Sequence, residues 1–173
     1  MRPWLLALIL VLTTVGVAAA LVTSEESGTG AENVGDDGRA EISAPQTCEA
    51  TDSNPGGTNN YIEDAPERES LGEGFVIEGF VRQSSDCRRL QDVAVQVWLA
   101  TETGGERDNR ATVRTDDEGR YRIETPPTIP QFGEPNIHVA VDGDERFEPV
   151  FIRRVVDLDD KRAVVNLTLR ARG

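Results

Sequence analysis

Short apolar stretches that alternate with polar residues recur from about residue 72 to the C-terminus. A period of two places successive side chains on opposite faces of an extended strand, so each stretch predicts a half-buried β-strand. No apolar stripe with helical spacing longer than two turns occurs after residue 70. The predicted strands occupy residues 75–81, 93–99, 111–115, 120–124, 136–142, 149–156 and 163–170.

About seven short strands in roughly 100 residues are typical of a sandwich of two packed sheets. We therefore predict an all-β fold for residues 71–173, a two-sheet sandwich of immunoglobulin or transthyretin type. Turn-forming sequences lie at residues 103–105, 116–119 and 141–144. The acidic turn at 116–119 separates two predicted strands, as the connection of a β-hairpin would. Trp98 alternates with the valines of its strand, and we expect a buried aromatic on the other sheet face.

The N-terminal 22 residues differ in composition from the rest of the chain, because an uncharged apolar run at residues 4–22 follows Arg2. Two interpretations of this hydrophobic helix remain open. The alanines at 18–20 offer the cleavage site of a signal peptide, whereas the run is long enough for a membrane anchor. In both cases Arg2 is expected to keep the N-terminus inside. We therefore predict a protein that is secreted, or membrane-anchored with its domain outside the cytoplasm.

Residues 23–47 are small and acidic, and this composition predicts a disordered linker. Residues 48–70 are also polar but contain Cys48 and Tyr61, so we predict an arm that a disulfide holds on the domain. Cys48 and Cys87 lack the C-x-x-C spacing of zinc and redox sites. In an exported protein they are expected to pair; two free, buried thiols are the alternative.

The formal net charge is −13, and an acidic surface repels phosphate groups, so nucleic acid and anionic lipid headgroups are poor partners. His138 is the only histidine in the chain. This count excludes metal sites that take two or three histidines from one chain. The G-x-S-x-G sequence of serine hydrolases is absent as well.

Four motifs occur in the order of one known family. They are the strand around Gly79, Val-Ala-Val-Gln-Val-Trp at 93–98, Thr-Asp-Asp-Glu-Gly-Arg-Tyr at 115–121 and Asn-Ile-His-Val at 136–139. Over about residues 48–155 this order resembles the core of the intradiol ring-cleavage dioxygenases. The first three motifs are shared with other transthyretin-like and carboxypeptidase-regulatory-like sandwiches, whereas Trp98 and the last motif favour the dioxygenase branch.

The resemblance implies a ferric iron held by two tyrosines and two histidines, which activates a bound catecholate toward oxygen. The two histidines would fall at positions 136 and 138, which share one face of a strand, but this chain has Asn136 and His138. The segments 101–110 and 126–136, where the resemblance places the tyrosine ligands, contain no tyrosine. Tyr121 matches a core aromatic of the family. Only His138 matches a metal ligand, and we expect it to be a surface or cleft residue kept by the strand geometry.

The leading hypothesis is therefore a non-catalytic sandwich with a binding or structural role in the envelope and no cofactor. Its partner would be a small molecule or an envelope protein, with the membrane reached through residues 4–22 if these are not cleaved. The second hypothesis is a divergent iron-dependent dioxygenase of catechol-type aromatics, in which Tyr61 and Tyr121 join His138 around Fe(III). The third is a carboxypeptidase-regulatory-like module that binds sugar or protein.

Overall fold

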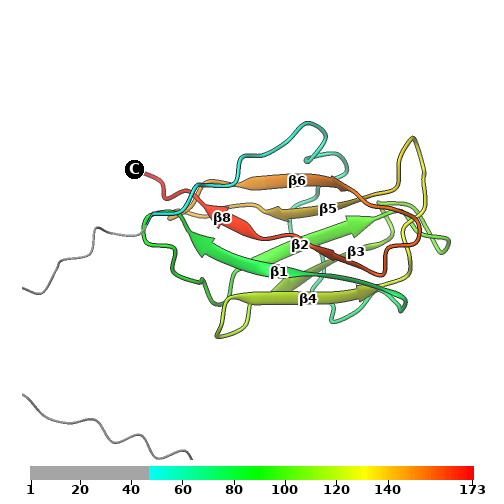
Figure 1. Cartoon of the computed structure of the whole chain (residues 1–173), viewed down its shortest axis with the longest axis horizontal. Helices are drawn as coiled ribbons and strands as arrows, with labels where there is room; N and C mark the ends of the chain where they lie inside the picture. Colours follow the sequence, from blue (N-terminus) through cyan, green and yellow to red (C-terminus); the bar gives the residue numbers. More distant parts are fainter. Residues whose placement is uncertain (1–46) are drawn as a thin grey trace, which may run out of the picture. The chain divides into compact units, whose positions relative to one another are not determined.

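A computed structural model describes residues 47–173 of the chain, and these residues form a sandwich of two β-sheets (Figure 1). The predicted all-β, two-sheet fold is confirmed. The strands are β1 (Phe75–Gln83), β2 (Ala94–Leu99), β3 (Arg110–Arg114), β4 (Arg120–Thr125), β5 (Asn136–Val141), β6 (Val150–Val155), β7 (Arg162–Val164) and β8 (Leu167–Leu169). Predictions for residues 1–46 lie outside the described residues. Within residues 47–173 no helix is long and apolar enough to cross a membrane.

The first sheet has the order β4-β1-β7, with β8 also paired to β1, and the second has the order β3-β2-β5-β6. All pairs of the second sheet are antiparallel, whereas β1 runs parallel to β7 and β8. The inner faces of the two sheets supply one apolar core, which removes their alternate side chains from water. This core includes Phe75, Ile77, Val81, Val95, Val97, Tyr121, Ile123, Ile137, Val139 and Leu167.

The turn at residues 116–119 is tight, but the prediction of a hairpin there is wrong. Gly119 N donates to Asp116 O at 2.9 Å, and Arg120 N donates to the Asp116 Oδ1 at 2.8 Å. However, β3 pairs with β2 and β4 pairs with β1, so the turn carries the chain from one sheet to the other. Alternation along a strand reports which face is buried and carries no information about the neighbouring strand.

The last apolar run, predicted as one strand over 163–170, forms the two strands β7 and β8. Between them, the Asn166 side-chain Oδ1 accepts a hydrogen bond from Phe80 N at 3.2 Å. This amide takes the place of a backbone acceptor and interrupts the ladder along β1.

Residues 48–70 form a strap across the second sheet, and the predicted disulfide between Cys48 and Cys87 is present, with the two Cα atoms 5.3 Å apart. The strap begins beside β8, where Thr51 N donates to Thr168 O at 2.8 Å. It passes the edge strand β6, seen beside the cyan segment in Figure 1, through a bond from Asn54 N to Phe151 O. It then crosses the sheet and reaches β3, where Thr112 N donates to Pro66 O at 2.9 Å. The strap therefore covers the outer face of the second sheet from edge to edge.

Candidate functional site

A row of four large polar or aromatic side chains crosses the outer face of the second sheet. Strand pairing places Arg153 of β6 opposite His138 of β5, His138 opposite Trp98 of β2, and Trp98 opposite Arg110 of β3. Ile137 and its alternate neighbours on β5 point into the core instead. Position 136 therefore shares the outer face with position 138, as the strand pattern predicted.

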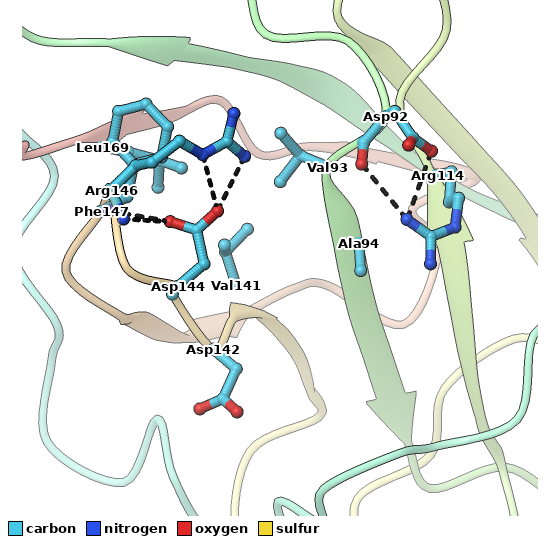
Figure 2. Close-up of a pocket in the computed structure, with 11 residues that line it drawn as sticks. Asp92, Val93, Ala94, Arg114, Val141, Asp142, Asp144, Arg146, Phe147 and Leu169 are labelled. Carbon is cyan, nitrogen blue, oxygen red and sulfur yellow. Dashed lines mark hydrogen bonds and ion pairs between the residues drawn. The ribbon is translucent and has the colours of Figure 1, made fainter.

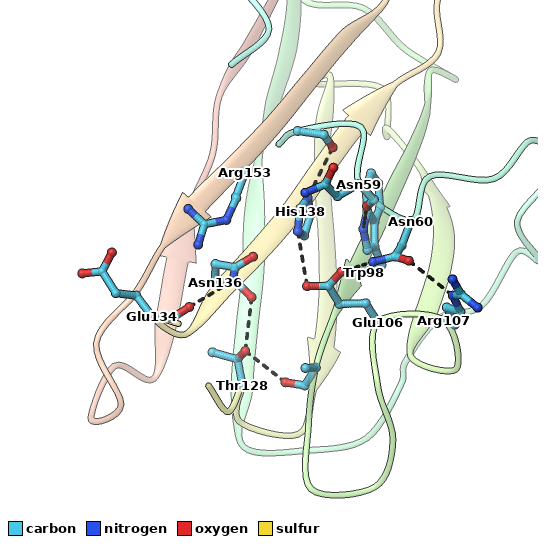
Figure 3. A network of polar contacts seen from close by, with 12 residues as sticks. Asn59, Asn60, Trp98, Glu106, Arg107, Thr128, Glu134, Asn136, His138 and Arg153 are labelled. Atoms are coloured by element: carbon cyan, nitrogen blue, oxygen red, sulfur yellow. Dashed lines mark hydrogen bonds and ion pairs between the residues drawn. The ribbon is translucent and has the colours of Figure 1, made fainter. Parts of the chain in front are cut away.

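Three members of this row bind backbone carbonyl groups of the strap. Figure 3 shows two of them, His138 and Trp98, beside the strap residues Asn59 and Asn60. The His138 Nδ1 lies 3.3 Å from Gly57 O and must be the donor there, because a carbonyl can only accept. The Trp98 Nε1 donates to Asn59 O at 2.8 Å, and an Arg110 terminal nitrogen donates to Asn60 O at 2.9 Å. The outer face of the second sheet thus holds the strap at Gly57, Asn59 and Asn60.

His138 is buried, 1% exposed, so it is not a surface residue, although it lines a cavity. Its ring stacks on Trp98, with centroids 4.8 Å apart and an interplanar angle of 11°. The Nε2 atom lies 3.5 Å from the Glu106 Oε1. Burial lowers the pKa of His138, while the Glu106 carboxylate and the Gly57 carbonyl oppose this shift. Both ring nitrogens already face groups of the protein.

Asn60 connects the strap to the loop between β2 and β3. Its side-chain amide donates to the Glu106 Oε2 at 2.5 Å and accepts from the Arg107 Nε at 3.4 Å (Figure 3). The backbone of Asn60 has a φ of 59°, in the left-handed region that asparagine tolerates better than most residues. We call this set of contacts around Asn60 the latch.

The two described tyrosines lie on opposite faces of the second sheet. Tyr61, in the strap, packs edge-on against Phe151 with ring centroids 5.0 Å apart. Burial and a hydrogen bond to the Asp142 carboxylate raise the pKa of Tyr61. Tyr121 is in the core, where its hydroxyl donates to Val165 O at 2.6 Å, and burial raises the pKa of Tyr121 as well. Both hydroxyls are therefore engaged with other groups of the protein, Val165 O and the Asp142 carboxylate.

Asn136, in place of the first family histidine, is also used inside the protein. Its Nδ2 donates to Glu134 O at 3.0 Å, and its buried Oδ1 has no hydrogen-bond partner among the described residues. Beside Asn136, His138 and Arg153 opens a cavity of about 280 Å³, with Phe132 at its border, 95% exposed.

A ferric iron held as in the dioxygenases does not fit these residues. The hydroxyl of Tyr121 is in the core and that of Tyr61 is beside Asp142, so the His138 Nε2 has the Glu106 carboxylate beside it in place of the two phenolates. Within residues 47–173 no group of three or more His, Cys, Asp or Glu side chains could hold a metal ion.

No protein-family model matches the sequence. A search of curated proteins found no relative. Solved structures do match the fold. Chlorocatechol 1,2-dioxygenase from Pseudomonas putida is 17% identical, with a TM-score of 0.51 over 64% of this chain and 68% of its own. An intradiol ring-cleavage dioxygenase from Tetranychus urticae is 14% identical, with a TM-score of 0.51 over 71% and 95% of the two chains.

The dioxygenase domain of a dioxygenase and carbohydrate-binding fusion from Streptomyces sp. SirexAA-E is 17% identical, with a TM-score of 0.53. This match covers 70% of our chain and 99% of that domain. The fold is therefore that of the intradiol ring-cleavage dioxygenases, as the four motifs suggested, in a chain with low sequence identity to them.

Sequence reasoning found His138 and Trp98 but missed Glu106, Arg110 and the strap carbonyls. One signal was available for Arg110, because it begins the strand whose next residues, Ala111 and Val113, alternate toward the core. A side chain at 110 continues the opposite, outer face. No signal pointed to Gly57, since a backbone carbonyl exists at every residue.

Proposed function

We propose that this chain is an exported or membrane-anchored, non-catalytic sandwich with a binding or structural role in the envelope. In this proposal the face that carries the iron ligands in the fold family now holds the strap. One observation supports it above all others: His138, Trp98 and Arg110 all donate to carbonyl groups of residues 57–60.

Two further features support export and binding. The Cys48–Cys87 disulfide suits an oxidising compartment outside the cytoplasm, which agrees with the apolar run at residues 4–22. The polar cavity beside Asn136 and Arg153, with an exposed phenylalanine at its border, is the kind of concave surface that accepts a small molecule.

The deciding experiment is the metal content and colour of the full-length protein produced with added iron. We expect far less than one iron per chain and no visible absorption band from phenolate-to-iron charge transfer. Tyr61→Phe and His138→Gln variants should match the parent protein in iron content, because neither residue is a ligand. Stoichiometric iron together with a visible band that the Tyr61→Phe variant loses would overturn the proposal.

A further inference from the structure

A second cavity, of about 670 Å³, lies against the latch and is separate from the one beside His138. Its lining comes from the strap, at Asn60, Tyr61, Ile62, Pro66 and Arg68, and from the end of the β2–β3 loop and the start of β3, at Arg107, Asp108 and Arg110. Its volume is in the range of sites that bind small molecules. Three guanidinium groups and one carboxylate, that of Asp108, line this cavity, so its lining is net positive in a chain with a net charge of −13.

In the cavity at the end of the sandwich, which Figure 2 shows, the lining arginines are paired with carboxylates. There Arg146 is paired with Asp144 at 2.7 Å and Arg114 with Asp92 at 3.2 Å, so each positive charge already has a carboxylate. By contrast, Arg68, Arg107 and Arg110 form no ion pair with any carboxylate of residues 47–173. Asp108 lines the same cavity without pairing with them.

Arg110 is the buried member of this set, 5% exposed. Its guanidinium donates to the carbonyls of Arg107, Asn60 and Glu106 at 3.0, 2.9 and 3.1 Å. These bonds use three of the five N–H groups of a guanidinium. The Asp108 and Glu106 carboxylates favour the positive charge of Arg110 from nearby, but neither forms an ion pair with it. Because the bonds to the three carbonyl groups leave N–H groups free, an anion in the cavity would find a buried donor already in place.

The remaining wall is apolar and accessible. Ile62 is 43% exposed, one of the few large apolar side chains that the fold leaves in water, and Pro66 is exposed beside it in the lining. The backbone of Ile62 is fixed, because its carbonyl accepts a bond from the Gln96 side chain at 2.7 Å. The cavity therefore joins a cationic side to a pre-formed apolar side.

We propose that this cavity binds a small organic oxyanion, a carboxylate or a phosphate ester that carries an apolar body. Arg68 and Arg107 contact the anionic group above the buried Arg110, since guanidinium matches both oxyanions with paired N–H donors. The apolar body lies against Ile62 and Pro66. The overall negative charge disfavours polyanions, so a ligand with a single anionic group fits best. This inference rests on the binding role proposed above and names its ligand class.

Calorimetric titration of the full-length protein tests the site with five probes. Phenylacetate and phenyl phosphate carry both features, acetate and inorganic phosphate carry only the anion, and benzyl alcohol carries only the ring. We expect saturable binding of phenylacetate, phenyl phosphate or both, with the simple anions about tenfold weaker and no binding of benzyl alcohol. The preferred aromatic anion tells carboxylate from phosphate ester. Failure of both aromatic anions to bind in the millimolar range would overturn the proposal.

Variants locate the binding. An Arg68→Gln, Arg107→Gln double variant removes two exposed cations and keeps Arg110, which the fold needs for the strap; we expect about tenfold weaker binding or more. Arg88→Gln, exposed and paired with Asp86 away from the cavity, is the matched control and should bind normally. If the protein is colourless and free of iron but the double variant binds the preferred aromatic anion as tightly as the parent, the ligand site is overturned and the proposed function stands. A coloured iron protein would overturn the proposed function, whatever the cavity binds.

Discussion

The outer face of the first sheet is exposed to solvent and that of the second sheet is covered, although the strands of both sheets show the same alternation of apolar and polar residues. On the first sheet, β4 alternates between exposed and buried residues, and its neighbour β1 bears Glu78, which pairs with Arg162 at the surface. On the second sheet, β2 is buried at every residue after Ala94, because the strap covers Trp98 and its neighbours. The same strand pattern thus produces a solvated face on one side and a second, polar interior on the other.

This difference indicates that the covered face of the second sheet contributes more to the stability of the fold than the exposed face of the first. Surface ion pairs such as Arg162–Glu78 contribute little, about 0–1 kcal/mol, since water and salt screen them. The covered face gains from packing and from buried hydrogen bonds, whose loss costs more. Substitutions on the second sheet should therefore cost several times more than matched substitutions on the first.

The largest effect is expected from releasing the strap. Replacing both Cys48 and Cys87 with serine opens a loop with a sequence separation of 39 residues. We expect a loss of about 4 kcal/mol in the free energy of unfolding, from the entropy of closing such a loop. Urea unfolding measures it, and Glu78→Gln on the first sheet, expected to cost at most about 1 kcal/mol, is the control. If the double serine variant lost no more free energy of unfolding than this control, the prediction that the disulfide stabilises the strap would be contradicted.

A smaller effect is expected from the aromatic residues of the two faces. Trp98→Phe removes the bond to Asn59 O and leaves a space beside His138, so we expect a loss of about 2 kcal/mol. Phe80→Leu on the first sheet alters a half-buried ring under the Arg89 guanidinium, and should cost under about 1 kcal/mol. Equal losses in the two variants would remove the distinction between the faces.

The smallest effect is the pH dependence that His138 contributes. Because burial lowers its pKa in the native state, the unfolded chain binds a proton near pH 6.5 that the native chain does not yet bind. Stability should therefore fall as the pH drops from about 7.5 through 6.5, by at most about 1.4 kcal/mol per pH unit, and level off once native His138 is protonated.

Unfolding curves between about pH 7.5 and 5.5 test this, with His138→Gln as the variant that lacks the titration. The difference in stability between the parent and the variant should shrink on acidification. A difference that grows instead would mean that an ion pair with Glu106 raises the pKa of His138 above its ordinary value.

The strands could be predicted because alternation is a local property, and the fold followed from their number, their spacing and the motif order. The error at residues 116–119 arose where the answer depended on strand pairing, which joins residues far apart in the chain. For the site, Asn136 in place of histidine and the tyrosine-free segments were visible without a structure. The burial of His138 was not, because the residues that cover it are about 80 positions upstream.

By itself, the sequence determined that the domain consists of half-buried strands, that a single histidine lies on the outer face of one of them, and that two cysteines are present to join an upstream arm to the domain. Only the tertiary structure decided that this arm lies across the face that bears the histidine. It also decided that Gly57, Asn59 and Asn60 of the arm accept hydrogen bonds from that face. The physical reason is that these acceptors are backbone carbonyls, which have no side-chain signature. Folding alone selects which of them meets His138, Trp98 or Arg110.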